Sequence, residues 1–500
     1  MKNIAVINAT DLRPPASRPI LNGHSSFGRV LDFAKGLPGV ERVAILASAD
    51  RRLPQETPRD CPVIERREWT VAGLTAEIER AGSDFEDVFY FFADCPFLDL
   101  GISRKMHESH RRYWADYSFA DGFPQGLTPE ILTRETVSRL RAMSSQDTRR
   151  PNRETLFEVI RKDINSFDIE TELAPSDLRL LRVSLSADSE RNFLLLKRIV
   201  EKGGHDPESI CRVLQEEPRI LRTLPAFFPI QIVERCPYAC SYCPYPVVAG
   251  DITKKNSVME PEEFADLTAR IAAFSGDAVI DISLWGEPSF HPELFQIVSS
   301  VLATPGLSLV IETSGIGWKP DIFYSVRDSF ASQPTWIVSI DASNDQMYRQ
   351  LRGSGFTDAV KTAELLLSIF PDKTWVQAVR MKENEEDLDV FYKMWKSKTE
   401  NIIIQKYDSF SSLLPDRKVA DLSPVKRFPC WHLKRDMAVL LDGTVPLCRE
   451  DLRIEHNLGN AFTEDLASIW DRGESVYRQH IAEKYPSLCA RCDEYYTYNF

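Results

Sequence analysis

The chain has 500 residues and a mass of 57.0 kDa, more than one ordinary domain of ~100–200 residues, which predicts roughly two to four domains. Its 43% hydrophobic and 27% charged residues exclude a disordered or collagen-like chain. A net charge of −13 and the lack of an apolar run of ~18–20 residues argue against nucleic-acid and membrane partners, so we expect a cytoplasmic protein.

The first part of the chain predicts an α/β domain over residues 1–222. Strand-like runs at 4–7, 42–46 and 87–92, with a helical segment at 26–35, have the spacing of a parallel α/β sheet. Glycine and proline punctuation between residues 203 and 225 marks the boundary that follows. We therefore expect a Rossmann-like fold here.

Residues 226–424 have a pattern typical of a barrel. Strand-like runs, separated by helix-like runs, lie near 229–233, 279–284, 307–312, 336–340, 374–379 and 401–405. This alternation implies a parallel sheet that is closed or nearly closed, a partial (β/α)6 TIM barrel. Such a fold places its chemistry at the carboxyl ends of the strands.

The tail, residues 425–500, has a different pattern. A β-hairpin is expected over 438–447, with Asp442-Gly443 suited to a tight turn, and a helix is expected over 465–471. The segment is short for a self-standing core, so a bound metal would help to stabilise it.

The ten cysteines are expected to be thiols rather than disulfides, because the compartment is reducing. Three of them are scattered and fit core positions. Cys236, Cys240 and Cys243 instead form C-x3-C-x2-C directly after the first barrel strand. Three thiolates there could hold three irons of a [4Fe–4S] cluster and leave the fourth iron open, whereas the alternatives are a zinc site lacking its fourth ligand or three core thiols.

This spacing resembles the signature of the radical S-adenosylmethionine (SAM) superfamily, and later segments resemble its other motifs. Trp285-Gly286-Glu287 is similar to the Gly-Gly-Glu motif, with Trp in place of the first Gly. The resemblance implies that Glu287 and nearby carbonyls receive the SAM amino group. It further implies that Ser339 contacts the SAM ribose and that the guanidinium of Arg352 pairs with the SAM carboxylate. Ser314 stands in the turn that ends the third strand of the family's barrel.

The mechanism that this resemblance implies is reductive cleavage of SAM by the reduced cluster. The resulting 5′-deoxyadenosyl radical then abstracts hydrogen from a substrate. A reductant such as flavodoxin or ferredoxin would be a partner.

A second cysteine set begins before the hairpin and continues after it. Its spacing is C-x17-C-x40-C-x2-C, and four thiolates could bind zinc or a complete [4Fe–4S] cluster. Alone, the set favours zinc. Behind a radical SAM barrel it resembles the SPASM extension in its shortened "twitch" form, which implies one auxiliary [4Fe–4S] cluster on Cys430, Cys448, Cys489 and Cys492.

An auxiliary cluster that accepts an electron would point to oxidation or cross-linking of the substrate. A base must then accept a proton. Candidate bases are Glu450 and Asp451, just after Cys448, and Asp408 at the end of the last strand, although each also fits a solvated surface charge.

The N-terminal region resembles the cytidylyltransferases that activate sugar acids. The resemblance implies that Asp94, in Asp-x-Pro after the third strand, and Asp188 bind Mg²⁺. The opening loop lacks the glycine-rich turn and the lysine that hold a triphosphate, so a retained fold used for binding or as a scaffold is favoured over transfer activity.

The combination is similar to the spiro-SPASM group. It implies a radical SAM oxidoreductase or maturase with a small-molecule or peptide substrate, and the N-terminal region favours a carbohydrate or nucleotide-linked one. Two other classes stay open: a nucleotidyltransferase with an accessory radical SAM domain, and a metal-stabilised binding protein without catalysis.

Overall fold

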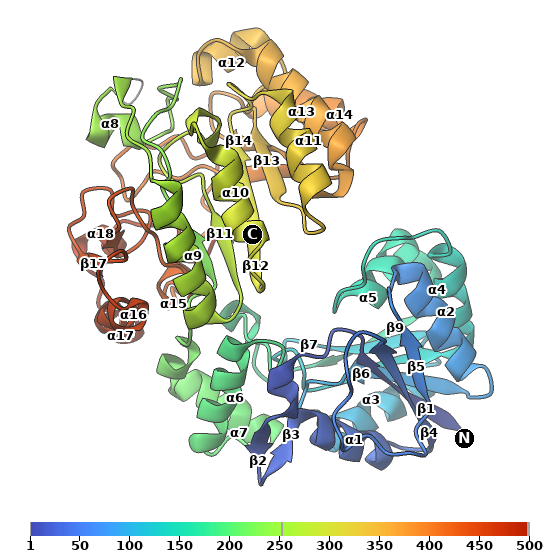
Figure 1. The fold of residues 1–500 in the computed structure, drawn as a ribbon. Helices are drawn as coiled ribbons and strands as arrows, with labels where there is room; N and C mark the ends of the chain where they lie inside the picture. Colours follow the sequence, from blue (N-terminus) through green and yellow to red (C-terminus); the bar gives the residue numbers. More distant parts are fainter. Residues whose placement is uncertain (1, 252–253, 498–500) are drawn as a thin grey trace. The chain divides into compact units, whose positions relative to one another are not determined.

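A computed structural model describes residues 2–251 and 254–497. The chain divides between Thr223 and Leu224 into two compact units, drawn from blue to green and from green to red (Figure 1). Within the described residues, no helix combines the length and apolar character needed to cross a bilayer.

The first unit is built on a seven-stranded sheet of order β5-β4-β1-β6-β8-β7-β9. The predicted runs at 4–7, 42–46 and 87–92 lie within β1, β4 and β6, which are parallel. Strand β8 runs antiparallel to both neighbours, so the sheet is mixed. Its strands are β1 (Asn3–Ala9), β4 (Val40–Ser48), β5 (Val63–Arg66), β6 (Asp87–Phe92), β7 (Tyr117–Asp121), β8 (Glu130–Thr133) and β9 (Ile169–Leu173), and a small ribbon pairs β2 (Pro19–Leu21) with β3 (His24–Ser25).

Strand β1 is buried on both faces, as expected for the centre of a sheet covered by helices. Ile4 and Val6 pack into one core with α2 and α4, while Ala5 and Ile7 pack into another with α1 and α3. This alternation is the two-residue period of a strand. The helices are α1 (Ser26–Gly36), α2 (Val71–Gly82), α3 (Leu100–Arg112), α4 (Arg134–Met143), α5 (Thr155–Ile160), α6 (Glu190–Glu201) and α7 (Pro207–Glu216).

The second unit contains a six-stranded parallel sheet in sequential order, β10 to β15. The sheet is a half-barrel, open between its first and last strands, rather than a closed barrel. The strands are β10 (Phe227–Pro229), β11 (Ala278–Asp281), β12 (Leu307–Thr313), β13 (Thr335–Ser339), β14 (Thr374–Arg380) and β15 (Ile402–Lys406).

Helices cover one face of this sheet, as Figure 1 shows for α9, α10, α11 and α13. Their apolar sides and the sheet form one core, in which Trp336 and Trp395 are fully buried. The helices are α8 (Tyr245–Ala249), α9 (Pro261–Ser275), α10 (Leu294–Leu302), α11 (Pro320–Ser329), α12 (Asp345–Leu351), α13 (Phe356–Ile369) and α14 (Glu385–Lys396).

The tail differs from the predicted hairpin. The turn at Asp442-Gly443 is present, with Gly443 at φ 83° and a bond from Leu440 N to Thr444 O. The two arms, however, pair elsewhere: residues 436–439 bridge to β10, and β16 (Thr444–Pro446) pairs with β17 (Asn457–Asn460). The physical reason is that the short β10 exposes an edge whose backbone groups need a partner.

Four helices complete the tail. Three of them, α15, α17 and α18, surround a small core that includes Cys430 and Cys489, whereas α16 packs into the core of the parallel sheet. The predicted helix at 465–471 matches α16. The helices are α15 (Trp431–Arg435), α16 (Leu466–Arg472), α17 (Glu474–Ile481) and α18 (Ser487–Ala490).

We expect Trp336→Ala to lower the free energy of unfolding of the second unit by about 3–5 kcal/mol, because it leaves a large cavity in the core. Trp336 is 0% exposed and its ring meets those of Trp318, Phe323 and Phe370. Guanidinium unfolding of the full chain measures the change. The control Trp114→Ala, at a side chain 85% exposed, should change stability by less than about 0.5 kcal/mol. Equal losses in the two variants would contradict the packing described.

Candidate functional site

The carboxyl ends of the parallel strands surround a cavity of about 310 Å³. Its wall includes Cys236 and Cys243 after β10, Glu312 in β12, Gln377 in β14 and Asp408 after β15. Parallel strands end at one edge of a sheet, so segments far apart in sequence meet here. The volume lies within the range of about 300–1,000 Å³ that is usual for small-molecule sites.

The first cysteine set lies on a partly buried loop at this cavity. Burial raises the pKa of the Cys236 and Cys243 thiols to about 12, and that of Cys240 is raised as well. Cys243 N donates to Cys240 O at 3.0 Å, and Cys236 and Cys243 both line the cavity, so the three thiols share one short loop at its wall. Because metal ligation needs thiolates, iron binding here must displace protons.

The cysteine loop is held by a buried ion pair at the ends of β13 and α12. Arg352 Nη1 lies 2.5 Å from Asp341 Oδ2 and donates to the Tyr242 hydroxyl at 2.6 Å. Tyr242 donates in turn to Asp341 Oδ2 at 2.5 Å. Arg352 is therefore paired with Asp341 in this structure. The Arg352 Nε is buried without an acceptor among the described atoms. Its predicted contact with the SAM carboxylate stays a prediction.

The structure brings two predicted SAM contacts together. Glu287 is buried, and its carboxylate accepts hydrogen bonds from Ser314 N at 2.7 Å, Ser314 Oγ at 2.6 Å and Thr313 Oγ1 at 2.6 Å. Burial outweighs these bonds and raises the pKa of Glu287. Ser314 thus fixes the carboxylate from the neighbouring strand end.

The segment before Glu287 has little steric freedom. A Cβ at Gly286 would lie 2.0 Å from the carbonyl oxygen of Val233, so only glycine fits. Trp285 has φ 53°, a left-handed conformation that costs about 1–2 kcal/mol outside glycine. Its ring stacks on Tyr245 and meets Phe410 at the cavity wall, contacts that hold the strained backbone in place.

Ser339 is buried and belongs to a polar network whose other members, Glu312 and Gln377, line the cavity. Its hydroxyl donates to Glu312 Oε1 at 2.8 Å, and Gln377 Nε2 donates to the same oxygen at 2.7 Å. Burial and the nearby Glu312 raise the pKa of Asp281 to about 7. Glu312, Gln377 and Asp281 were not anticipated, because a polar side chain inside a strand carries no sequence signal of its own.

The second cysteine set lines one small enclosed cavity, in which all four thiols take part. Burial raises the pKa of Cys430 to about 12 and that of Cys489 to about 11, and raises those of Cys448 and Cys492. Arg449, which directly follows Cys448, lines both this cavity and the larger one.

The two cysteine sets fit iron–sulfur clusters by the number and type of their donors. The first set offers three thiols, enough for three irons of a cube, and the second offers four, enough for a complete one. In the described part of the chain, one group of possible ligands has all its donor atoms within 4.8 Å of one another, and it contains no cysteine.

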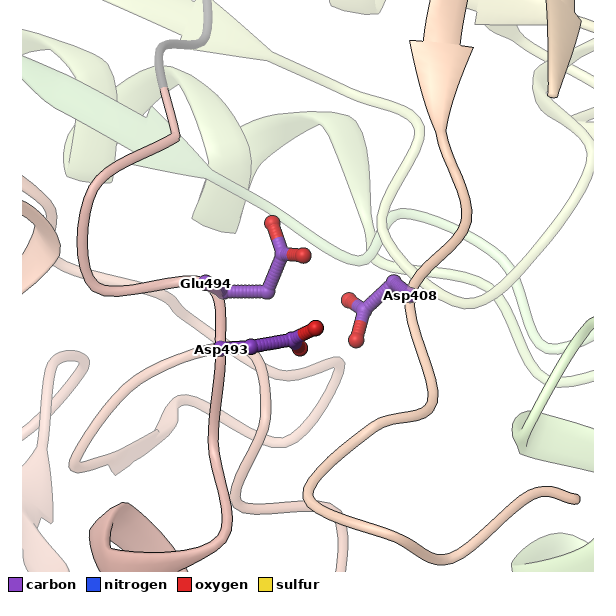
Figure 2. A group of neighbouring side chains, drawn as sticks. All are labelled: Asp408, Asp493 and Glu494. Atoms are coloured by element: carbon purple, nitrogen blue, oxygen red, sulfur yellow. The ribbon is translucent and has the colours of Figure 1, made fainter. Parts of the chain in front are cut away.

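That one group consists of carboxylates, Asp408, Asp493 and Glu494, which point toward one another in Figure 2. Lys406 pairs with both Asp493 and Glu494, and Lys418 lies 3.0 Å from Asp493. These two lysines compensate part of the negative charge of the group.

The three candidate bases occupy different places. Asp408 lines the large cavity, and Arg449 lies 3.5 Å from it. Glu450 lines the cysteine cavity, 3.2 Å from Arg449. Asp451 accepts from the backbone nitrogens of residues 455 and 456, so it caps a turn. Of the three, Asp408 alone lines the large cavity.

In the first unit, the predicted magnesium ligands Asp94 and Asp188 lie on either side of Arg153. One guanidinium nitrogen, Nη2, is 2.5 Å from Asp94 and 3.2 Å from Asp188. The role of the two aspartates as metal ligands stays a prediction.

Comparison with known proteins agrees with the cysteine geometry. Residues 230–394 match the model of the radical SAM superfamily, and residues 430–493 match that of the SPASM iron-sulfur cluster-binding domain. An uncharacterized protein of Treponema pallidum (strain Nichols) is 42% identical over 360 residues, which cover 69% of this chain and 98% of that protein.

Two solved structures are more distantly similar to this chain. SuiB of Streptococcus suis, bound to its precursor peptide SuiA, is 13% identical over 63% of this chain and 78% of its own, with a TM-score of 0.43. A cytidylyltransferase from Leptospira borgpetersenii is 17% identical over 44% of this chain and 96% of its own, with a TM-score of 0.36. Neither likeness assigns a substrate.

We expect Gly286→Ala to push the segment of residues 285–287 away from Val233, because the added Cβ would lie 2.0 Å from the Val233 carbonyl oxygen, a backbone atom that cannot rotate away. Stability should fall by about 1–3 kcal/mol, as for other overpacked sites, and SAM affinity should fall by about tenfold or more. Denaturant unfolding and anaerobic equilibrium binding of SAM measure the two effects. In the control Gly101→Ala the nearest atom is a side-chain oxygen at 3.1 Å, and both quantities should stay near wild type. Unchanged SAM affinity in Gly286→Ala would contradict the placement of the motif.

Proposed function

Because this chain belongs to the radical SAM superfamily and carries a SPASM iron-sulfur cluster-binding domain, we propose that it oxidises or otherwise modifies a small substrate held in the cavity at the strand ends. One observation carries the proposal: this cavity has Cys236 and Cys243 in its wall and also Arg449, the neighbour of Cys448. A substrate there would lie between the two cysteine sets.

When bound, SAM and the first cluster supply hydrogen-atom abstraction, and the auxiliary cluster accepts the electron that remains on the substrate. The residues of the chain hold and orient these groups. Glu287, fixed by Ser314, would receive the SAM amino group, Ser339 would contact the ribose, and Arg352 would meet the carboxylate. Cys236, Cys240 and Cys243 would bind the first cluster, and the auxiliary cluster would bind to Cys430, Cys448, Cys489 and Cys492.

Asp408 is the proposed proton acceptor. Burial and the neighbouring Glu494 raise its pKa, while Arg449 and Lys406 act in the opposite direction. A carboxylate whose pKa lies nearer neutrality is a better general base than an ordinary aspartate. Arg449 supports it by keeping a compensating positive charge at the cavity wall.

A hydroxyl-bearing substrate, carbohydrate or nucleotide-linked, is favoured over a peptide. The cavity wall presents carboxylate, hydroxyl and amide groups from Asp281, Ser283, Glu312 and Gln377. These groups can form hydrogen bonds with several hydroxyls of one substrate molecule. A one-electron reductant such as flavodoxin or ferredoxin would supply the first cluster.

Iron content and SAM cleavage test the two cysteine sets separately. The chain reconstituted without oxygen should contain about eight irons and, with dithionite, convert SAM to 5′-deoxyadenosine. Cys240→Ala should lose about four irons and all cleavage, whereas Cys492→Ala should lose about four irons and retain cleavage.

The matched control for both variants is Cys61→Ala, at a cysteine in the core of the first unit, and it should keep iron content and cleavage at wild-type levels. A wild-type chain that takes up zinc alone and releases no 5′-deoxyadenosine would refute the proposed function.

The pH dependence of stability tests the environment of Asp408. Its pKa is higher in the folded chain than in the unfolded chain, so its contribution to stability is present at low pH and is lost as pH rises. Asp408→Asn should therefore be more stable than wild type at pH 8, by about 1–3 kcal/mol, and the gain should shrink toward pH 5. Anaerobic guanidinium unfolding at several pH values measures the difference.

The same variant should still cleave SAM, because Asp408 is not among the proposed SAM contacts. The exposed Asp389→Asn, on α14, is the matched control and should show no gain at either pH. A stability difference for Asp408→Asn that grows as pH falls would show that Asp408 has an ordinary or lowered pKa and would remove it as the base.

A further inference from the structure

The first unit contains a cation of its own between the two aspartates predicted to bind Mg²⁺. Arg153 Nη2 contacts Asp94 Oδ2 at 2.5 Å and Asp188 Oδ2 at 3.2 Å. The guanidinium lies over the ring of Phe92, 4.6 Å from its centre, and Nη1 lies 3.7 Å from Cys95 Sγ. A single nitrogen thus bridges the two oxygens that a divalent ion would have to share.

The guanidinium and a Mg²⁺ ion exclude each other at this place. Mg²⁺ requires oxygen ligands at about 2.0–2.1 Å in octahedral order, and it does not tolerate a second cation among them. Asp94 is 5% exposed, so its charge needs a partner, and Arg153 supplies it. The guanidinium also holds the pKa of Asp188 below its ordinary value despite burial.

The opening loop of the first unit, where the cytidylyltransferase resemblance would place the triphosphate, also offers few donors to a phosphate. Pro14 and Pro15 begin the short turn that stands where phosphate-binding amides would be needed, and proline has no amide hydrogen to donate. Arg18 pairs with Glu190 at 2.7 Å and stacks on Phe193. The other cations near this loop are also paired, since Asp11 lies 3.0 Å from Arg51 and 3.1 Å from Arg150.

We propose that Arg153 is a built-in replacement for the divalent cation of the first unit, so that Asp94 and Asp188 share one internal guanidinium rather than a magnesium ion. The unit then keeps its α/β scaffold without metal-dependent nucleotidyl transfer. This inference is independent of the radical chemistry proposed for the second unit.

Mn²⁺ alone, as a probe for Mg²⁺, tests the proposal in the full chain loaded with its clusters. Free Mn²⁺ is measured by room-temperature electron paramagnetic resonance during titration, in wild type, Asp94→Asn, Arg153→Met and the double variant. Wild type and Asp94→Asn should give the same isotherm. Arg153→Met should gain one Mn²⁺ site whose affinity is at least tenfold higher than that of any site in wild type. The double variant should lose this site.

Two results would overturn the proposal. One is a wild-type site that Asp94→Asn removes, because Mn²⁺ would then coexist with Arg153. The other is a folded Arg153→Met chain, with a wild-type unfolding midpoint, that gains no site. If Arg153→Met does not fold, the comparison of wild type with Asp94→Asn decides alone, because equal isotherms support the proposal and unequal ones refute it.

Discussion

The hydrogen bonds that cover the free edge of β10 are the constraint on which the second unit depends. An open parallel sheet leaves unpaired backbone groups along its first strand. Here Met437 N donates to Phe227 O at 3.0 Å, Val439 N donates to Pro229 O at 2.9 Å, and Gln231 N donates to Val439 O at 2.9 Å. Since Cys430 and Cys448 stand on either side of this segment, covering the edge also brings the second cysteine set to the barrel. The segment that completes the sheet therefore also positions the second cysteine set.

The same arrangement concentrates buried charge between the two cysteine sets. Arg449 faces Asp408, Glu450 and Glu494, all of them buried. Burying several carboxylates around few cations costs stability, and burial raises the pKa values of Asp408 and Glu450 accordingly. Proteins commonly keep such costly groups where chemistry needs them. Their place next to the cavity therefore links an energetic cost of the fold to its proposed function.

Charge compensation differs between the acids of the two candidate sites. In the first unit Arg153 lies between Asp94 and Asp188. In the second, Asp281 and Glu312 face an open cavity and no salt bridge joins either to a cation among the described residues. Charged groups that are already paired within the protein contribute little to ligand binding, whereas polar groups that face a cavity can bind a ligand directly.

Local sequence was sufficient for the α/β alternation, for the boundary near residue 223, and for the grouping of Cys236, Cys240 and Cys243, because each is encoded within a few neighbouring residues. The hairpin at 438–447 was wrong in its pairing, although its Asp442-Gly443 turn was right, because the competing partner, β10, lies some two hundred residues away in the sequence.

The same limit applies to the site. The engagement of Arg352 with Asp341, the separation of Asp408 from Asp451 and the guanidinium between Asp94 and Asp188 all depend on which distant strands end side by side. Residue type and spacing state which chemistry a segment can offer. Burial, charge compensation and contacts across the sheet, which exist only after folding, select which of those groups face the cavity.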